Sequence, residues 1–385
     1  MNIFTDDSGN INRDKVLQVL DEKLKIAWPG VDELCVSKIS GGYSNLLLKI
    51  EDIKFGRKGV LRIYGNHITN EKTKLKNILV AQALHEQNLG PKMFFHLPCG
   101  YFEEFLDGHS LHMNDLHKSE ITSKLGYQMG KIHALKIDID KSKSMWDDIG
   151  NWIDLIEDEL KEALKLLSVD EMSKQLGLEL IDKCVIPKDE NEILIKVKPE
   201  LAPKNENVPE FINIKMLRDE LSFIKQSISK CQSEIVFCHN DCHEGNMLFD
   251  DEKRTLLPID FEYASYNHRA FDFSQTLNHF AWEYGAKNKL GYRIFMDKYP
   301  NQEQLVLFFT NYLKAFDNTK ATVSELIKES EIFKPLPHFV WTVWGITKHF
   351  ENKKCAELSH NSASFDRLSM YYIYKNELIK KLDDL

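Results

Sequence analysis

Apolar and polar residues alternate in short runs between residues 35 and 64, and this pattern predicts strands. The runs Cys35–Ile39, Leu46–Ile50 and Val60–Tyr64 are separated by two glycine-containing segments, 41–42 and 56–59. Short alternating runs bounded by glycine are typical of strands joined by tight turns. We therefore expect a small antiparallel sheet in this part of the chain.

One helix and two more strands are expected next. Apolar residues recur every three or four positions over residues 70–88, and the Gly-Pro pair at 90–91 is a typical helix stop. Residues 92–97 and 101–105 have the pattern of short strands. On this basis we place an N-terminal lobe at residues 1–105.

The rest of the chain, residues 106–385, is predicted to form a larger and mainly helical lobe. Short strands interrupt it between residues 235 and 257, and the pattern is helical from Ala270 onward. Four of the eleven prolines lie between residues 186 and 210, which favours a surface insertion in that stretch. The expected fold class is therefore α+β, with a small antiparallel-sheet lobe followed by a large helical lobe.

Composition and charge exclude several classes of protein. The 385 residues include 50 basic and 59 acidic side chains, a formal net charge of −9, so we expect no nucleic-acid partner. No apolar stretch approaches the roughly 18 residues that a membrane span needs, and residues 1–12 do not resemble a secretory signal. The seven cysteines are scattered and odd in number, which is typical of a reducing compartment. These features predict a cytoplasmic protein without a membrane span.

The densest polar segment lies at residues 239–246, and a second one follows at 259–262. Asp241, Asn246 and Asp260 supply a carboxylate, an amide and a second carboxylate. Phosphoryl transfer uses one carboxylate beside the attacking hydroxyl, and an amide and a carboxylate on Mg²⁺. The step of five residues from Asp241 to Asn246 is also the spacing of kinase-like catalytic loops. The alternative is a polar turn whose Asp and Asn side chains bond only to the backbone.

Four possible metal ligands, Cys238, His239, Cys242 and His243, lie close together in the same segment. Structural zinc sites usually combine two pairs of ligands, and no second pair lies at the expected spacing. A catalytic or core role therefore explains these side chains better than zinc binding.

Segments 239–246 and 259–272 together resemble the choline/ethanolamine kinase family, a branch of the protein-kinase-like and aminoglycoside phosphotransferase-like fold. Residues 242–245 look more like the choline kinase branch. The similarity extends to four shorter segments at 41–45, 61–65, 89–91 and 339–344, and it spans about residues 35–375. It implies a two-lobed kinase-like enzyme that uses ATP and Mg²⁺.

The resemblance also implies roles for individual residues. Asp241 would be the catalytic residue that meets the substrate hydroxyl, and Asn246 and Asp260 would bind Mg²⁺. Asp272 would brace the catalytic loop. The ATP site would comprise Gly41, Gly42, Ser44, Asn45, Arg62, Gly65, Gln87, Glu104, Leu106, His243 and Asp260.

The acceptor pocket implied by the resemblance is lined by Tyr263, Tyr284, Trp341 and Trp344. A quaternary ammonium cannot donate a hydrogen bond, so its recognition relies on aromatic faces and nearby carboxylates. Trp341 and Trp344 are three residues apart on an expected helix and therefore share a face. Taken alone, such a pair of tryptophans is more often core than pocket.

Several positions depart from the family pattern, and three of them motivate the regulatory alternative given below. Asn77 stands where a Glu partner of Arg62 is expected, Gln87 replaces an Arg that contacts phosphate, and His279 replaces a pocket carboxylate. Protonation of His279 would oppose a bound cation, which predicts weaker binding of choline as the pH falls toward about 6.

The function implied by the resemblance is ATP-dependent phosphorylation of choline to phosphocholine, the first step of phosphatidylcholine synthesis by the CDP-choline route. One alternative is a kinase for ethanolamine or a related amino alcohol. Another is a catalytically weak, kinase-like regulatory protein, which the three departures favour. The resemblance further implies a homodimer.

Overall fold

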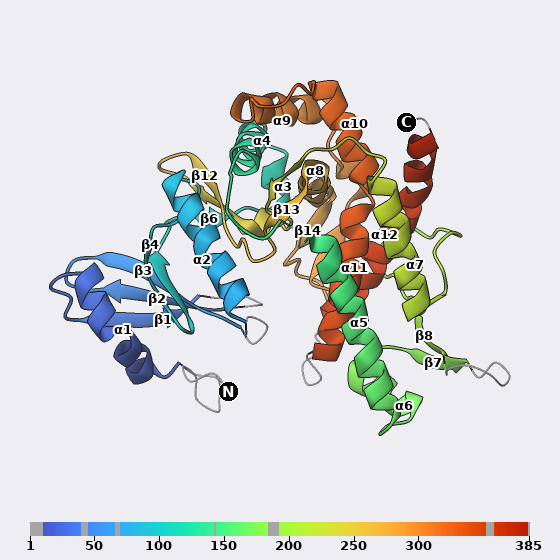
Figure 1. Ribbon diagram of the computed structural model, residues 1–385, viewed down its shortest axis with the longest axis horizontal. Helices are drawn as coiled ribbons and strands as arrows, with labels where there is room; N and C mark the ends of the chain where they lie inside the picture. The colour runs from blue at the N-terminus through green and yellow to red at the C-terminus, as the bar shows by residue number, and fades with distance from the viewer. Residues whose placement is uncertain are drawn as a thin grey trace. The chain divides into compact units, whose positions relative to one another are not determined.

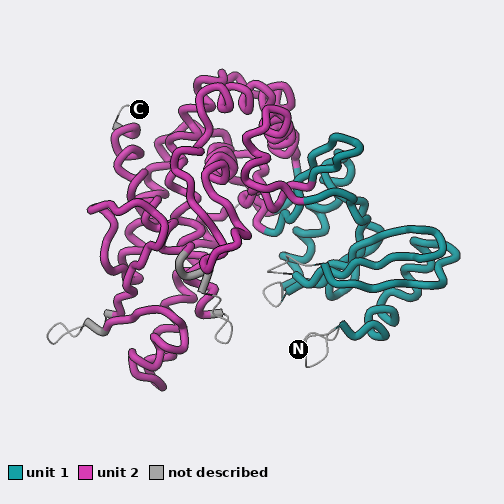
Figure 2. The backbone as a smooth tube through the Cα atoms, turned by 180° about the vertical axis from the view of Figure 1, so that it is seen from behind, with its two compact units in different colours: residues 1–109, 137–139, 249–262 teal, residues 110–136, 140–248, 263–385 magenta. Residues whose placement is uncertain are grey.

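The computed structural model describes residues 11–39, 45–65, 70–141, 144–183, 192–351 and 358–383. The chain divides into two compact units, coloured separately in Figure 2. Unit 1 comprises residues 1–109, 137–139 and 249–262, and unit 2 comprises 110–136, 140–248 and 263–385. Unit 1 thus includes a segment that follows the catalytic loop in the sequence, in addition to the N-terminal residues.

Unit 1 is built on a five-stranded antiparallel sheet with the strand order β1-β2-β3-β5-β4. Its strands are β1 (Leu34–Lys38), β2 (Leu46–Asp52), β3 (Arg57–Ile63), β4 (Met93–Leu97) and β5 (Gly100–Glu104). The helices α1 (Arg13–Ala27) and α2 (Glu71–Glu86), both blue in Figure 1, belong to the same unit. The sheet and α2 confirm the expected elements, whereas α1 was not predicted.

The core of unit 1 forms where one face of the sheet meets α1. Leu48, Leu61 and Phe102 are opposite one another on β2, β3 and β5 and are fully buried. Leu20 of α1 packs in the same cluster. Phe102 lies so close to β3 that a Cβ at Gly59 would be 2.3 Å from its ring. Glycine is therefore required at this position, because any larger residue would displace a core aromatic ring.

Unit 2 is mainly helical. Its helices are α3 (Met113–Leu116), α4 (Ser119–His133), α5 (Met145–Leu164), α6 (Val169–Leu176), α7 (Ile214–Ile228), α8 (Arg269–Asn278), α9 (Gln302–Ala315), α10 (Val323–Phe333), α11 (Leu336–Glu351) and α12 (Leu358–Asp383). Three single turns of 3₁₀ helix are η1 (Glu244–Asn246), η2 (His279–Ala281) and η3 (Met296–Lys298). The mainly helical character of this unit confirms the predicted α+β fold class.

Short strand pairs interrupt the helices. The remaining strands of the chain are β6 (His109–Ser110), β7 (Leu180–Lys183), β8 (Glu192–Lys196), β9 (Phe211–Ile212), β10 (Ile235–Cys238), β11 (Met247–Asp250), β12 (Thr255–Pro258), β13 (Ser265–His268), β14 (Trp282–Tyr284) and β15 (Tyr292–Ile294). The pair β10–β13 is antiparallel and frames the loop that holds the polar segment 239–246. The pair β14–β15 lies in the part of the chain that was expected to be entirely helical.

Two helix pairs position the candidate site. Helices α4 and α9 lie side by side (Figure 1), and a Cβ at Gly126 of α4 would be 2.1 Å from the carbonyl oxygen of Phe308. Glycine therefore lets the two backbones approach closely. Helices α11 and α12 also pack together, and the Thr342 hydroxyl donates to the Ser364 carbonyl at 3.1 Å.

The stretch 186–210, expected to be a surface insertion, contains the strand β8. Residues 184–191 lie outside the described residues. The following strand β8 pairs with β7 and β9, and its Ile193 and Ile195 side chains are 6% and 1% exposed. The prolines that marked this stretch flank a strand whose alternate apolar residues enter the core.

A membrane-spanning helix must be both long and apolar, and none of the helices in the described part of the chain meets both conditions.

Candidate active site

The loop of residues 239–246, which the resemblance makes the catalytic loop, follows β10, and a buried carboxylate holds it in place. The backbone N–H groups of His239 and Asn240 donate to the two oxygens of Asp272, at 2.7 and 2.6 Å. Asn240 has a φ of 67°, in the left-handed region, and its side-chain amide donates to the Tyr263 carbonyl at 2.9 Å. Such a strained residue needs support from its surroundings. Asp272 therefore braces the loop, as the resemblance implied.

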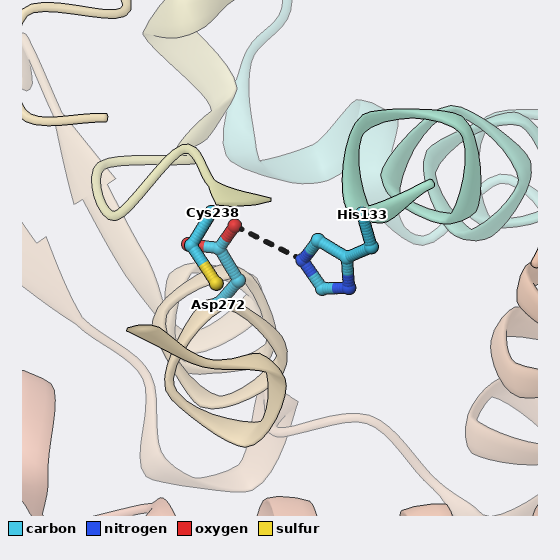
Figure 3. A group of neighbouring side chains, drawn as sticks. All are labelled: His133, Cys238 and Asp272. Carbon is cyan, nitrogen blue, oxygen red and sulfur yellow. Dashed lines mark hydrogen bonds and ion pairs between the residues drawn. The ribbon is translucent and has the colours of Figure 1, made fainter. Parts of the chain in front are cut away.

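Asp272 is itself positioned by α4 and α9. His133 Nε2 lies 3.2 Å from Asp272 Oδ2, and His133 Nδ1 lies 3.1 Å from the hydroxyl of Tyr312. Figure 3 shows His133, Asp272 and Cys238 facing one another. The Cys238 thiol donates to the Asn267 carbonyl at 3.5 Å, and burial holds its pKa well above the usual value. We interpret this group as structural, because both Asp272 oxygens already accept backbone N–H groups.

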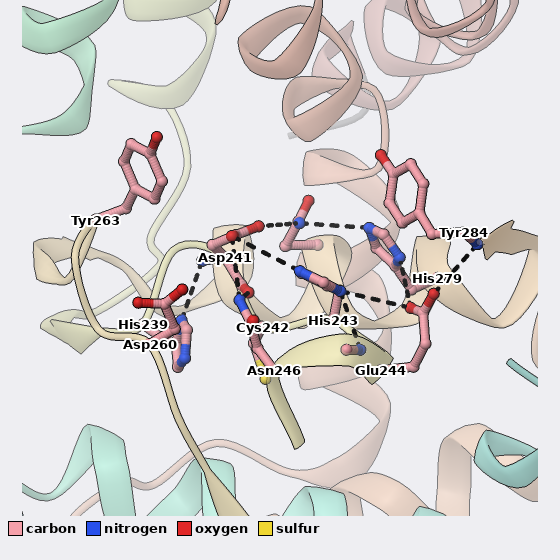
Figure 4. Close-up of polar contacts among 12 residues, drawn as sticks. His239, Asp241, Cys242, His243, Glu244, Asn246, Asp260, Tyr263, His279 and Tyr284 are labelled. Atoms are coloured by element: carbon pink, nitrogen blue, oxygen red, sulfur yellow. Dashed lines mark hydrogen bonds and ion pairs between the residues drawn. The ribbon is translucent and has the colours of Figure 1, made fainter. Parts of the chain in front are cut away.

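Asp241 stands in the loop with its carboxylate oriented by two amide side chains. Asn246 Nδ2 donates to Asp241 Oδ2 at 3.2 Å and to the Asp241 carbonyl at 3.0 Å. Gln275 Nε2 donates to Asp241 Oδ1 at 3.3 Å, and Gln275 Oε1 accepts from Trp341 Nε1 at 2.9 Å. Figure 4 shows the carboxylate at the centre of these contacts. The Asp241 side chain is 20% exposed.

Asn246 and Asp260 supply oxygen atoms of the kind that Mg²⁺ prefers. Because Nδ2 of Asn246 is used on Asp241, its Oδ1 atom remains to bind a cation. Asp260 belongs to unit 1 and has a φ of 65°. Its Oδ1 atom accepts from Arg62 Nη1 at 3.2 Å, and its side chain is 33% exposed.

Arg62 on β3 finds a carboxylate partner that the sequence analysis missed. Arg62 Nε donates to Glu103 Oε1 at 3.4 Å, and Glu103 is 6% exposed on the neighbouring strand β5. Burial alone would lower the pKa of Arg62, but Tyr101, Glu103 and Asp260 raise it, so the guanidinium stays charged. Glu103 is therefore a carboxylate partner of Arg62, whereas the family pattern would place a Glu partner at position 77, where this chain has Asn.

Five other expected nucleotide residues of unit 1 lie within the described part of the chain: Asn45, Gly65, Gln87, Glu104 and Leu106. Gly41, Gly42 and Ser44 lie outside the described residues. The N–H of Gly65 donates to Asn45 Oδ1 at 3.2 Å, which joins the start of β2 to the end of β3. Gln87 is exposed at the C-terminus of α2, Glu104 ends β5, and Leu106 follows it half-buried.

Three of the four expected pocket aromatics form one group, which we call the aromatic cluster: Tyr263, Trp341 and Trp344. Trp344 Nε1 donates to the Tyr263 hydroxyl at 2.7 Å. The ring of Trp341 lies 5.4 Å from that of Tyr263 and 5.7 Å from that of Trp344, both edge-on. Trp341 is buried, whereas the other two rings are partly exposed.

Tyr284, the fourth expected aromatic residue, lies apart from the aromatic cluster beside His243 and His279. The Tyr284 ring is 5.9 Å from the His243 ring and 5.5 Å from the His279 ring. Burial lowers the pKa of His243 to about 3 and that of His279 well below its usual value. Both imidazoles are therefore neutral near neutral pH, and the expected protonation of His279 near pH 6 does not follow.

A carboxylate and a guanidinium flank His279, and the sequence analysis identified neither. His279 Nδ1 lies 2.9 Å from Glu244 Oε2, and Arg367 Nη2 donates to His279 Nε2 at 3.2 Å. His279 therefore carries its proton on Nδ1 and accepts at Nε2. Glu244 comes from the catalytic loop and is 4% exposed. Glu244 therefore supplies a carboxylate beside His279, which itself stands where the family resemblance had implied a carboxylate.

The possible zinc ligands of the loop do not form one group. Among the described residues, the side chains that could jointly hold a metal are His133 with Cys238 and Asp272, and His243 with Glu244 and His279. In the second group, Glu244 and Arg367 already engage both nitrogens of His279. The contacts favour a hydrogen-bonded network over a metal centre.

The chain is similar to a known protein family over most of its length. The choline/ethanolamine kinase family model matches residues 36–372. Choline kinase A2 of Caenorhabditis elegans is 27% identical over 402 aligned residues, which cover 92% of this chain and 84% of that protein. A probable ethanolamine kinase A of Dictyostelium discoideum is also 27% identical, over 90% of this chain and 87% of that protein.

Solved structures show the same fold. An ethanolamine kinase of Plasmodium vivax matches with a TM-score of 0.69 at 20% identity, over 94% of this chain and 89% of that one. A choline kinase of Cryptosporidium parvum matches with a TM-score of 0.67 at 20% identity, over 96% and 97%. The chain belongs to the choline/ethanolamine kinase family, whose members are phosphotransferases that act on an alcohol.

Proposed function

We propose that this protein transfers the terminal phosphoryl group of ATP to the hydroxyl of choline and so forms phosphocholine. The observation that carries the proposal is the geometry at Asp241, whose carboxylate is oriented by Asn246 and Gln275 and is partly exposed. This reaction would supply phosphatidylcholine synthesis by the CDP-choline route.

In this proposal, Asp241 orients the acceptor hydroxyl and takes its proton as the new O–P bond forms. The two amide donors keep the carboxylate in one rotamer. They also stabilise its charged form, because both donate to it. The brace from Asp272 holds the loop backbone, so the carboxylate needs no rearrangement when the acceptor binds.

The proposed nucleotide residues are those expected from the sequence, and Arg62 is the best supported of them. Its guanidinium is charged, partly buried and aligned by Glu103, which suits a fork that contacts phosphate oxygens. Asn246 and Asp260 are the proposed ligands of Mg²⁺, and their oxygen donors fit a hard cation. When bound, Mg²⁺ would offset the negative charge of the triphosphate.

Choline is the proposed acceptor because the aromatic cluster presents ring faces and edges rather than a set of hydrogen-bond acceptors. Ethanolamine is the second candidate. Its primary ammonium has three N–H donors and needs oxygen acceptors, and Glu244 supplies a carboxylate whose Oε1 lies 3.5 Å from the backbone nitrogen of Tyr284. The matched relatives include both choline kinases and ethanolamine kinases.

Release of ADP from Mg-ATP tests this proposal, with choline, ethanolamine and no acceptor compared in parallel. The proposal predicts choline-dependent turnover that exceeds turnover with ethanolamine. Turnover with ethanolamine alone would move the assignment to the second candidate. Folded protein that binds Mg-ATP but turns over with neither acceptor would favour the regulatory alternative. The presence of Asp241, Asn246 and Asp260 together argues against that alternative.

We further propose that the protein is a cytoplasmic homodimer, as its family resemblance implies. Light scattering on the eluted peak of a gel-filtration column tests the assembly. A mass of twice 44.8 kDa is expected, and a mass of 44.8 kDa would contradict the dimer.

A further inference from the structure

Arg367 of α12 places a buried positive charge beside the proposed acceptor pocket. The residue is 2% exposed, and its Nη2 atom donates to the Tyr284 hydroxyl at 2.7 Å and to His279 Nε2 at 3.2 Å. Its guanidinium carbon lies 4.4 Å from the centre of the Trp282 ring and 5.8 Å from that of Tyr284. The protein thus sets a cation of its own against two aromatic rings.

The charge of Arg367 has no direct carboxylate partner among the described residues. Its Nε and Nη1 atoms are buried without a hydrogen-bond acceptor. The nearest negative charge along the contacts is that of Glu244, and His279 stands between the two. A buried guanidinium without a paired carboxylate is costly to keep. Its field is also poorly compensated, so it extends to the neighbouring groups.

Several groups of the pocket respond to this field. Burial lowers the pKa of His279, and Arg367 lowers it further. Burial raises the pKa of Tyr284, and Arg367 opposes that rise. The same charge contributes to the low pKa of His243, which lies 3.8 Å from Asp241. The guanidinium therefore acts across the region in which the acceptor is proposed to bind.

We propose that Arg367 is a specificity-determining residue that weakens the binding of cationic acceptors. Its guanidinium lies against the rings of Trp282 and Tyr284, so these rings are not available to a second cation. The ammonium group of an acceptor therefore binds at the aromatic cluster instead. The fixed charge repels that ammonium, while Glu244 attracts it. The balance between Arg367 and Glu244 sets how strongly the enzyme prefers a charged acceptor. This inference rests on the proposed function.

The test compares choline with its uncharged carbon isostere, in which a tert-butyl group replaces the trimethylammonium group. The ratio of the two kcat/KM values at saturating Mg-ATP measures the preference for charge. Arg367→Gln keeps N–H donors for His279 and Tyr284 but removes the charge, and we expect it to raise the ratio about tenfold. Arg367→Lys keeps the charge and should leave the ratio within about twofold.

Two further variants separate charge from packing. Arg367→Met keeps an apolar stem against Trp282 but removes the charge, so it should raise the ratio as Arg367→Gln does. If the Arg367→Gln variant does not fold, Arg367→Met tests the same prediction. Arg293→Gln removes an exposed guanidinium from β15 and should not change the ratio. Equal effects of Arg367→Gln on both alcohols would show a packing role and overturn the inference.

Failure of the inference is distinguishable from failure of the proposed function. If the wild-type protein phosphorylates neither choline, nor its uncharged isostere, nor ethanolamine, the proposed function is wrong. The inference, which depends on that function, is then wrong as well. If the wild-type protein phosphorylates choline and the ratio in Arg367→Gln and in Arg367→Met stays at the wild-type value, only the role of Arg367 is contradicted.

Discussion

Gln275 links Trp341 of the proposed acceptor pocket to Asp241, the proposed catalytic carboxylate, through a single side chain. Its amide nitrogen donates to Asp241, and its amide oxygen accepts from the indole of Trp341. The indole N–H therefore fixes which end of the Gln275 amide faces Asp241. Trp344 has a different partner, the hydroxyl of Tyr263, and is partly exposed. The two tryptophans share a helix face, yet the structure assigns them different tasks.

Substitution of each tryptophan should therefore change a different kinetic constant. Trp341→Phe removes the N–H and leaves a ring, so we expect kcat to fall about fivefold, which corresponds to about 1 kcal/mol for one lost hydrogen bond. Trp344→Ala removes a partly exposed ring of the aromatic cluster, so we expect the KM for choline to rise about tenfold while the KM for ATP stays constant. Steady-state kinetics with each substrate varied in turn measures both. Equal increases of both KM values in Trp344→Ala would instead indicate a packing role.

At the scale of elements, three helices and one strand converge on the catalytic loop. Asp272 of α8 accepts two backbone N–H groups from the loop that follows β10. His133 of α4 contacts Asp272, and Tyr312 of α9 contacts His133. The loop conformation is thus set by tertiary contacts and not by its own turn residues alone.

Asp272→Ala should uncouple the loop from α8. Two buried N–H groups would lose their acceptor, so we expect a loss of about 3 kcal/mol in the free energy of unfolding. The loss of alignment at Asp241 should also lower kcat more than it changes either KM. Chemical denaturation and steady-state kinetics measure the two effects. Asp251→Ala, in an exposed turn of unit 1, is the matched control and should change neither. Unfolding curves that coincide with wild type would contradict the brace.

At the scale of the whole molecule, unit 2 holds several buried or half-buried histidines in the neutral form. Burial is the main cause that lowers the pKa of His133, His243, His268, His279 and His338. In the unfolded chain each has a pKa of about 6.5. As the pH falls below that value, the unfolded state binds protons that the folded state does not bind. Stability is therefore complete above about pH 6.5 and is lost as the pH falls further.

The expected cost is about 1.4 kcal/mol per pH unit for each fully neutral histidine, until the pH reaches its pKa in the folded state. Melting temperatures measured from about pH 7.5 to about pH 5 should fall steeply on the acid side. His338→Gln should make that fall shallower, because one of the buried imidazoles is gone. A melting temperature that is independent of pH over this range would contradict the neutral, buried state of these histidines.

Local sequence patterns were sufficient for the features that depend on neighbours along the chain. The strands of unit 1 follow from alternating residues and glycine turns, and the five-residue step from Asp241 to Asn246 lies within one loop. Glu103 and Arg367 could not be found in this way. Glu103 meets Arg62 across neighbouring strands, 41 residues apart in sequence, and Arg367 meets His279 across 88 residues. Such contacts depend on how elements pack, which periodicity does not encode.

The central claim is that Asp241 directs phosphoryl transfer to a choline hydroxyl. Phosphorus NMR of the reaction with Mg-ATP and choline, with wild type and Asp241→Asn compared at equal concentration, tests it most directly. We predict that phosphocholine forms with the wild type and at least about a hundredfold more slowly with Asp241→Asn, while ATP affinity and melting temperature stay unchanged. Phosphocholine formation by Asp241→Asn at a rate close to wild type would contradict the account.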